Sequence, residues 1–171
     1  ISIIPTGMGA AGYTMPLPDN DEMFNTKNKM LEDITTLLGG RVAEEIIFGD
    51  ITTGASNDIK RATETARSMV MKYGMSEKIG LIAYGNDDDE VFIGRDLAHT
   101  RGYSEEVARE IDEEISRIIR ECHENAESII RENIGVLHSC AALLLEKEKI
   151  HREEFEALFT TEKEEVAKTN E

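Results

Sequence analysis

The amino-acid sequence predicts a mainly α-helical fold, a helical bundle with a small β-strand element at its N-terminus. Apolar residues recur every three or four positions through most of the chain after residue 26, which is the spacing of a helix face. The first 18 residues instead contain short extended pieces around a glycine-rich turn. A length of 171 residues with 40% apolar residues fits one domain with a sizeable core and excludes wholesale disorder.

The N-terminal element consists of the extended pieces "ISII" and "GYTMPL", which flank the turn "TGMGAAG". Pro16 and Pro18 end the second piece, because proline interrupts a strand. These patterns predict a small hairpin or a pair of edge strands.

The first helix is predicted to run from Thr26, a residue type that caps helix N-termini, to about Phe48. Its apolar row has helical spacing and comprises Leu31, Ile34, Leu37, Leu38, Val42 and Ile46. Gly39 and Gly40 interrupt this helix at a cost of about 1 kcal/mol each relative to alanine. The pair marks either a kink or break, or a flat surface where another helix or backbone comes unusually close.

The second helix is predicted from about Asn57 to Tyr73, with Gly74 just past its end. Asp58 heads the row that includes Ala62, Ala66, Met69 and Tyr73. An acid in the first turn gains about 0.3 to 1 kcal/mol from the helix dipole. Since Asp58 shares its side with apolar residues, the alternative is a buried carboxylate that needs hydrogen-bond donors or a cation. That cation is either a metal ion or one of the nearby arginines, Arg41, Arg61 and Arg67.

The rest of the chain is predicted to be irregular over residues 75–102 and strongly helical from Ser104 onward. A long helix reaches about Asn133, and its apolar stripe comprises Val107, Ile111, Ile115, Ile118, Cys122, Ala126 and Ile129. A further helix covers "IGVLHSCAALLLEKEKI", and the short segment "HREEFEALF" follows. We assign residues 1–159 to one domain and predict that the highly charged segment 160–171 is a disordered acidic tail.

The charge balance excludes several classes of partner. With 19 basic and 35 acidic residues, the net charge of −16 disfavours nonspecific binding to nucleic acid or to an anionic membrane surface. Cys122 and Cys140 have no paired framework, which indicates free thiols in a reducing compartment. No apolar run approaches the roughly 18 residues of a membrane span, and nothing resembles a signal peptide. We therefore expect the piece itself to be soluble.

Common catalytic and nucleotide-binding motifs are missing. The four histidines are His99, His123, His138 and His151, and no two of them lie four residues apart as in His-x-x-x-His. No Gly-x-Ser-x-Gly nucleophile turn and no Walker-type phosphate loop occurs. We therefore expect no ATP binding by this chain alone.

Several segments resemble the peptidase domain of FtsH-type proteases, which are membrane-anchored, ATP-dependent AAA+ zinc metalloproteases. The resemblance covers roughly residues 1–133 and rests on "SIIPTGMGAAGYTMPLP", "LLGGRVAEEIIFGDITTGASNDIKRATETARSMVMKYGMSEKIG", "VFIGRD" and "YSEEVAREIDEEI". It implies a mostly helical peptidase domain in a homo-hexameric ring beneath ATPase modules, which use ATP and Mg and pass unfolded polypeptides to zinc sites.

The same resemblance implies roles for particular residues. In the family, zinc is held by two histidines of a His-Glu-x-x-His helix and by an aspartate of an "ASND" motif, whose position here is Asp58. Glu44 and Glu45 become candidates to orient ligands, although Glu45 could equally pair with Arg41. Gly39 and Gly40 would let their helix lie close to the zinc-binding helix. The strand next to the family's active site corresponds to Gly12, Tyr13, Thr14 and Met15, which could bind an extended substrate through the backbone or simply pack as a hairpin.

One departure from the family is decisive for the expected activity. No His-Glu-x-x-His occurs in these 171 residues. We therefore expect a truncated C-terminal piece of a protein-quality-control protease that lacks proteolytic activity and zinc by itself. The parent would reach the membrane only through its missing N-terminal region, with the peptidase domain on the cytoplasmic side in bacteria or in an organelle interior. The alternative is a non-catalytic helical interaction or oligomerisation domain.

Overall fold

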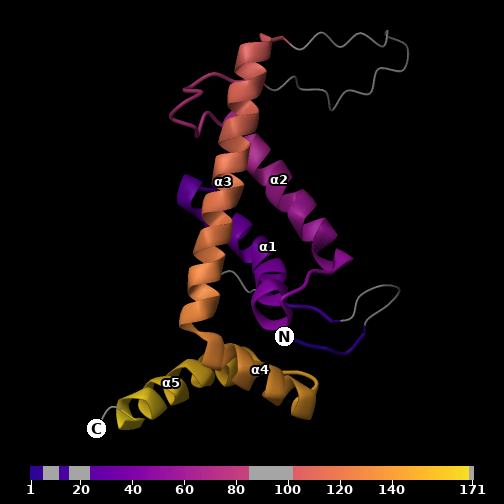
Figure 1. Ribbon diagram of the computed structural model, residues 1–171, viewed down its shortest axis with the longest axis vertical. Coiled ribbons are helices and arrows are strands. Elements are labelled where there is room, and N and C mark those ends of the chain that lie inside the picture. The colour runs from indigo at the N-terminus through magenta and orange to yellow at the C-terminus, as the bar shows by residue number, and fades with distance from the viewer. Residues whose placement is uncertain (6–11, 16–23, 85–101, 170–171) are drawn as a thin grey trace. The chain divides into compact units, whose positions relative to one another are not determined.

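The structure, a computed structural model, describes residues 1–5, 12–15, 24–84 and 102–169, and only the backbone of residues 161–169. Over these residues it contains five α-helices and one 3₁₀-helix, so the predicted mainly helical class is confirmed (Figure 1). The chain divides into two compact units, residues 24–128 and residues 1–23 with 129–171.

Helix α1, Lys27–Phe48, begins and ends as the sequence predicts. The Thr26 hydroxyl accepts a hydrogen bond from the Lys29 amide at 3.1 Å, which satisfies one of the free N–H groups of the first turn. Gly49 ends the helix in the left-handed conformation, with φ of 62°, which glycine adopts without steric cost.

The glycine pair inside α1 causes no break. The helix is continuous through Gly39 and Gly40, and a Cβ atom added to either would meet nothing within 4 Å among the described residues. The described chain therefore brings no element unusually close to this flat surface.

The 3₁₀-helix η1, Thr53–Ala55, leads directly into α2, Ser56–Met71. Helix α2 ends two residues earlier than predicted. Gly74, with φ of 60°, turns the chain there, and the Met75 amide donates to the Met69 carbonyl at 2.9 Å. The left-handed turn thus replaces the last predicted residues of the helix.

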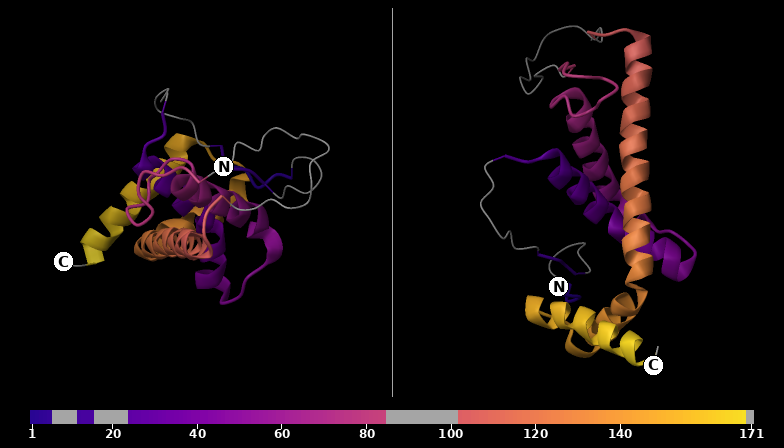
Figure 2. Two further views of the ribbon diagram at one scale, coloured as in Figure 1. Left: turned by 90° about the horizontal axis from the view of Figure 1, so that it is seen from above. Right: turned by 90° about the vertical axis from the view of Figure 1, so that its left-hand side faces the viewer.

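Helix α3, Glu105–Glu132, is a single uninterrupted helix (Figure 2). The Ser104 hydroxyl accepts a hydrogen bond from the Val107 amide at 3.3 Å and so caps its start. The buried side of α3 follows most of the predicted stripe, whereas Ile129 is 48% exposed.

The core of the first unit joins α1, α2 and α3. Twelve buried residues of the described chain form it: Met30, Ile34, Leu38, Ala62, Ala66, Met69, Val70, Ile79, Ile111, Ile115, Ile118 and Cys122. Three of them belong to the row that Asp58 heads, which confirms that this row faces the core, while Tyr73 at its other end is exposed. This packing fixes the direction of α2 and hence of its first turn.

The second unit contains α4, Ile134–Lys147, and α5, Arg152–Thr169. Cys140, Leu144 and Ile150 form its small core, with Ile1, Leu143, Phe155 and Leu158 packed against them. Helix α5 includes residues 160–169, where the composition predicts a disordered tail.

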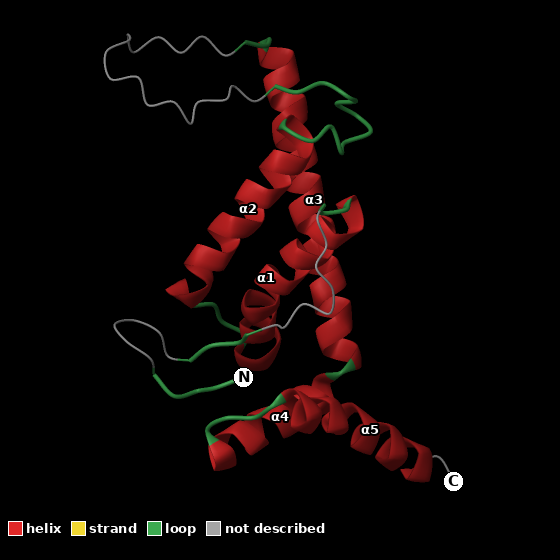
Figure 3. Cartoon of the chain, turned by 180° about the vertical axis from the view of Figure 1, so that it is seen from behind, coloured by secondary structure: helices red, strands yellow, loops and turns green. Residues whose placement is uncertain are grey.

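The predicted N-terminal strands are absent from the described residues (Figure 3). Ser2 instead forms two isolated antiparallel bridges, one with Tyr13 and one with Lys149. Among the described residues, Ser2 thus pairs with one residue on each side, and neither bridge is extended into a ladder. The predicted glycine-rich turn lies outside the described residues.

In the part of the chain that the structure describes, no single helix is long and apolar enough to cross a membrane. Helices α3 and α4 meet the length and composition criteria only when they are taken together as a bent pair.

Candidate metal-ligand site

Asp58 lies in the first turn of α2, at the point where the chain leaves η1. Its side chain is 46% exposed, and one carboxylate oxygen lies 3.7 Å from Nη1 of Arg61. That separation is longer than a hydrogen bond, so the side chains of the described residues do not saturate the oxygens of Asp58. Of the three arginines considered from the sequence, Arg61 is the one that approaches Asp58. The carboxylate is therefore partly solvated and positioned to accept a further cation.

The loop before α2 is held by two side chains of α1. Arg41 donates from Nη2 to the Thr52 carbonyl at 2.7 Å. Glu44 accepts from the Thr52 hydroxyl at 2.7 Å and from the Thr52 amide at 3.1 Å. The amide, the carbonyl and the hydroxyl of Thr52 are thus all engaged by residues one turn apart on α1.

The hydroxyl of Thr52 also makes a second hydrogen bond, to the backbone of η1. Its oxygen accepts a hydrogen bond from the Gly54 amide at 3.2 Å and so caps η1. A Cβ atom added to Gly54 would lie 3.2 Å from that oxygen, which is a tight approach. Thr52 therefore connects α1 to the short helix that leads to Asp58.

Glu44 is held in its charged form by this contact. The hydrogen bonds from the Thr52 hydroxyl and amide lower the pKa of the Glu44 carboxyl below its ordinary value, and Arg41 contributes in the same direction. Glu44, which the sequence analysis proposed as a residue that orients ligands, therefore binds the loop that precedes Asp58.

Glu45 does not pair with Arg41, the partner that its position on the same helix offered. Its Oε2 lies 3.1 Å from Nε2 of His123 on α3, whereas Arg41 turns to Thr52. Both Glu45 and His123 are about one-third exposed. This pair links α1 to α3 and is a contact that the sequence analysis missed, because nothing in local spacing connects residues so far apart.

The candidate substrate-binding segment, Gly12 to Met15, lies against the N-terminal residues. The Tyr13 amide donates to the Ser2 carbonyl at 2.8 Å, and the Ser2 amide donates to the Tyr13 carbonyl at 2.9 Å. A Cβ atom on Gly12 would collide with the Ser2 carbonyl oxygen, so only glycine fits there. Thr14 and Met15 are exposed.

A complete metal site is not assembled by the residues that the structure describes. Within them, no three histidine, cysteine, aspartate or glutamate side chains gather closely enough to hold an ion. His123, His138 and His151 therefore do not supplement Asp58. A partly exposed carboxylate with unsaturated oxygens fits one ligand of a zinc ion whose other ligands come from outside these residues.

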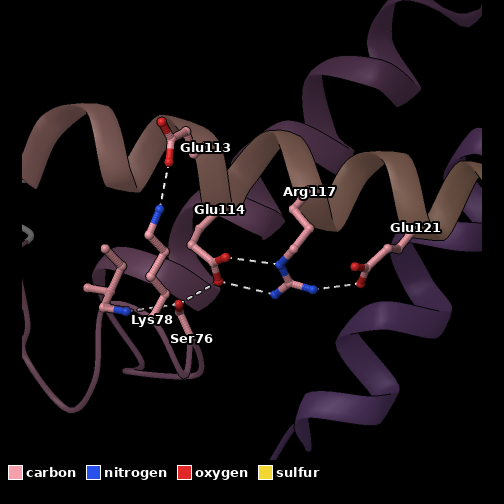
Figure 4. Close-up of polar contacts among 7 residues, drawn as sticks. Ser76, Lys78, Glu113, Glu114, Arg117 and Glu121 are labelled. Carbon is pink, nitrogen blue, oxygen red and sulfur yellow. Dashed lines mark hydrogen bonds and ion pairs between the residues drawn. The ribbon is translucent and has the colours of Figure 1, made fainter.

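A separate polar network centres on Glu114, which is only 6% exposed (Figure 4). Its carboxylate accepts from the Ser76 hydroxyl at 2.6 Å and from Nε and Nη2 of Arg117 at 2.9 Å and 3.1 Å. Arg117 also donates to Glu121 at 2.7 Å. The network fastens the segment after α2 to α3, and it contains none of the candidate site residues.

Comparison with known proteins gives consistent matches over nearly the whole chain. The family model described as Peptidase family M41 matches residues 1–158. The ATP-dependent zinc metalloprotease FtsH 1 of Thermoanaerobacter sp. (strain X514) is 55% identical over 162 residues, 95% of this chain and 26% of that protein. Relatives with the name ATP-dependent zinc metalloprotease FtsH occur in Caldicellulosiruptor bescii, at 56% identity over 158 residues, and in Thermotoga maritima, at 49% over 166 residues. These alignments include 92% and 97% of this chain but only 26% and 27% of the relatives, so the chain spans about a quarter of their length.

Proposed function

The chain belongs to peptidase family M41, and from this premise we propose that it forms part of the peptidase unit of an ATP-dependent zinc metalloendopeptidase. The observation that carries the proposal is the position of Asp58, a carboxylate with unsaturated oxygens at the start of a helix whose opposite end is fixed by the core. The substrates of this metalloendopeptidase are unfolded, misassembled or regulatory proteins, so its activity belongs to protein quality control.

Asp58 has the role of one metal ligand. Zinc, when bound with two further ligands, supplies Lewis acidity and an activated water for peptide hydrolysis. The chain itself contributes the Asp58 carboxylate and the means to hold it, with Glu44 acting from α1 through the loop before α2. Glu45 fastens α1 to α3 through His123.

The segment from Gly12 to Met15 receives the substrate. Its exposure and its backbone pairing with Ser2 support this role, because an extended polypeptide can bind alongside such a segment through backbone hydrogen bonds that do not depend on side-chain identity. The exposed side chain of Met15, 69% accessible, is available to contact the added chain.

We place this chain in a larger assembly. The complete protein carries an ATPase module that uses ATP and Mg, forms a homo-hexamer and is anchored in a membrane, with the peptidase unit on the cytoplasmic side in bacteria or inside an organelle. This chain alone contains no His-Glu-x-x-His and does not cleave peptides by itself.

The test is the substitution Asp58→Asn in the complete protein. We expect it to remove most proteolysis of an unfolded substrate and to leave ATP hydrolysis unchanged, because asparagine keeps the size but loses the charge that binds zinc. Asp33→Asn is a matched control, since Asp33 is a helical aspartate with 48% side-chain exposure and an ion pair to Lys29. Proteolysis that survives Asp58→Asn would show that Asp58 is only a helix-start residue. A complete protein that contains no His-Glu-x-x-His and has no proteolytic activity would instead favour a non-catalytic interaction domain.

A further inference from the structure

The contacts of Thr52 extend the candidate site beyond its expected residues. Thr52 lies six positions before Asp58, and its only intervening structure is η1 and the first turn of α2. A displacement of Thr52 is therefore passed to Asp58 through a short, hydrogen-bonded segment. Such a segment allows little independent movement of the two residues.

The geometry at Thr52 is unusually restrictive for an exposed loop. Glu44 contacts the amide and the hydroxyl with its two carboxylate oxygens, which fixes the residue in orientation as well as in position. Arg41 contacts the carbonyl from the preceding turn of the same helix. Loops are ordinarily the mobile parts of a protein, so three direct bonds from one helix are more than chain connection alone requires.

The partners of Thr52 belong to a rigid part of the molecule. Val42 and Leu38, on the same helix α1, are 1% and 4% exposed. Ala62, which follows Asp58 by one turn on α2, is fully buried. Asp58 is thus held between a packed helix on one side and a loop clamped to a second packed helix on the other.

We propose that Thr52 is a positioning residue for the metal ligand Asp58, and that Arg41 and Glu44 clamp it for this purpose. The inference rests on the proposed function. Metal ligands depend on residues behind them for orientation, and loss of such support costs about 10- to 100-fold in metal affinity or activity. Thr52 acts through η1 rather than by touching the carboxylate, so its loss belongs at the lower end of that range.

The experiment compares Thr52→Val and Thr52→Ser in the complete protein. Valine keeps the shape but removes the hydroxyl that binds Glu44 and Gly54, whereas serine keeps the hydroxyl. We expect zinc affinity, measured by competition with a chelator, to fall about 10-fold in the valine variant and to stay near wild type in the serine variant. The kcat for an unfolded substrate falls with it, while KM and ATP hydrolysis stay unchanged.

A second readout does not depend on activity. Hydrogen exchange of the Gly54 amide should accelerate in Thr52→Val and not in Thr52→Ser, because only valine removes the acceptor of that amide. Thr36→Val is the matched control, since Thr36 is an exposed threonine of α1 whose hydroxyl donates to the Glu32 carbonyl of its own helix. It should leave zinc affinity and Gly54 exchange unchanged.

The outcomes separate this inference from the proposed function. A wild-type protein without zinc-dependent proteolysis would overturn both. Zinc-dependent wild-type proteolysis with unchanged zinc affinity in Thr52→Val would overturn the positioning role alone. If Thr52→Val does not fold, Arg41→Met removes the donor to the Thr52 carbonyl, and unchanged zinc affinity in that variant would count against the inference in the same way.

Discussion

At the scale of single residues, Glu114 is a nearly buried acid whose surroundings stabilise its charge. Its two oxygens together accept three hydrogen bonds, two of them from the Arg117 guanidinium. Arg117 and then Ser76 lower the pKa of the Glu114 carboxyl, and this outweighs the opposing effect of burial. Lys78 adds a further attraction, although its direct partner is Glu113.

The predicted effect is a loss of stability when Glu114 is neutralised. Glu114→Gln should lower the free energy of unfolding of this chain by about 1 to 3 kcal/mol at pH 7, since a charged hydrogen-bonding partner of Arg117 is removed. Because the folded-state pKa is depressed, this stabilisation is complete above the ordinary glutamate pKa of about 4.3 and disappears as the pH falls through the folded-state pKa. Urea unfolding at neutral and acidic pH should show the wild type and the variant converging at low pH.

The neighbouring residue provides the control for this prediction. Glu113→Gln changes the same atoms in an acid that is 55% exposed and pairs with Lys78 at the surface. Its effect on stability should be small, as for most surface ion pairs. Equal losses in the two variants would show that general charge, rather than the buried network, sets the stability.

At the scale of elements, the glycines of α1 are predicted to differ in what they contribute. Gly49 has φ of 62°, so Gly49→Ala forces an L-residue into the left-handed region at a cost of about 1 to 2 kcal/mol. Gly39 lies in the helix interior with free space around it. Gly39→Ala should therefore raise the stability of this chain by about 0.5 to 1 kcal/mol. Thermal unfolding should therefore show a lower Tm for Gly49→Ala and a higher Tm for Gly39→Ala than for the wild type.

The same Gly39 variant distinguishes the two purposes of the glycine pair. If a further helix packs on Gly39 and Gly40 in the complete protein, Gly39→Ala will stabilise this chain and still impair proteolysis of the complete enzyme. Full activity of the alanine variant would mean that no element needs the flat surface. In that case the glycines are an intrinsic weakness of α1 and nothing more.

At the scale of the whole chain, helices were predictable and the contacts between them were not. Helical spacing and the cap Thr26 place α1 correctly, and helical spacing places α3, because these signals are local. The predicted N-terminal strands do not occur among the described residues, where Ser2 pairs with Tyr13 and also with Lys149, and no local pattern reveals so distant a partner. Asp58 was selected by family resemblance. The proposed positioning of Asp58 depends on the hydrogen bond from the Thr52 hydroxyl to Glu44, which lies eight residues earlier in the chain. Side-chain contacts of that kind follow no fixed spacing.

The two compact units should differ in how readily they open. The described residues of one unit include a core of twelve buried side chains, eleven from three helices and Ile79 from the segment after α2, whereas the other has a core of three. Local opening is easier where fewer apolar side chains are buried. Native-state hydrogen exchange should therefore show stronger protection in α1, α2 and the first 24 residues of α3, Glu105 to Ser128, than in α4. Val136 and Cys140 of α4 are buried, as are Ala62 and Ala66 of α2, so their amides offer a comparison at matched side-chain exposure. Similar protection at these four positions would mean that both units open together, and the division into units would then have no counterpart in stability.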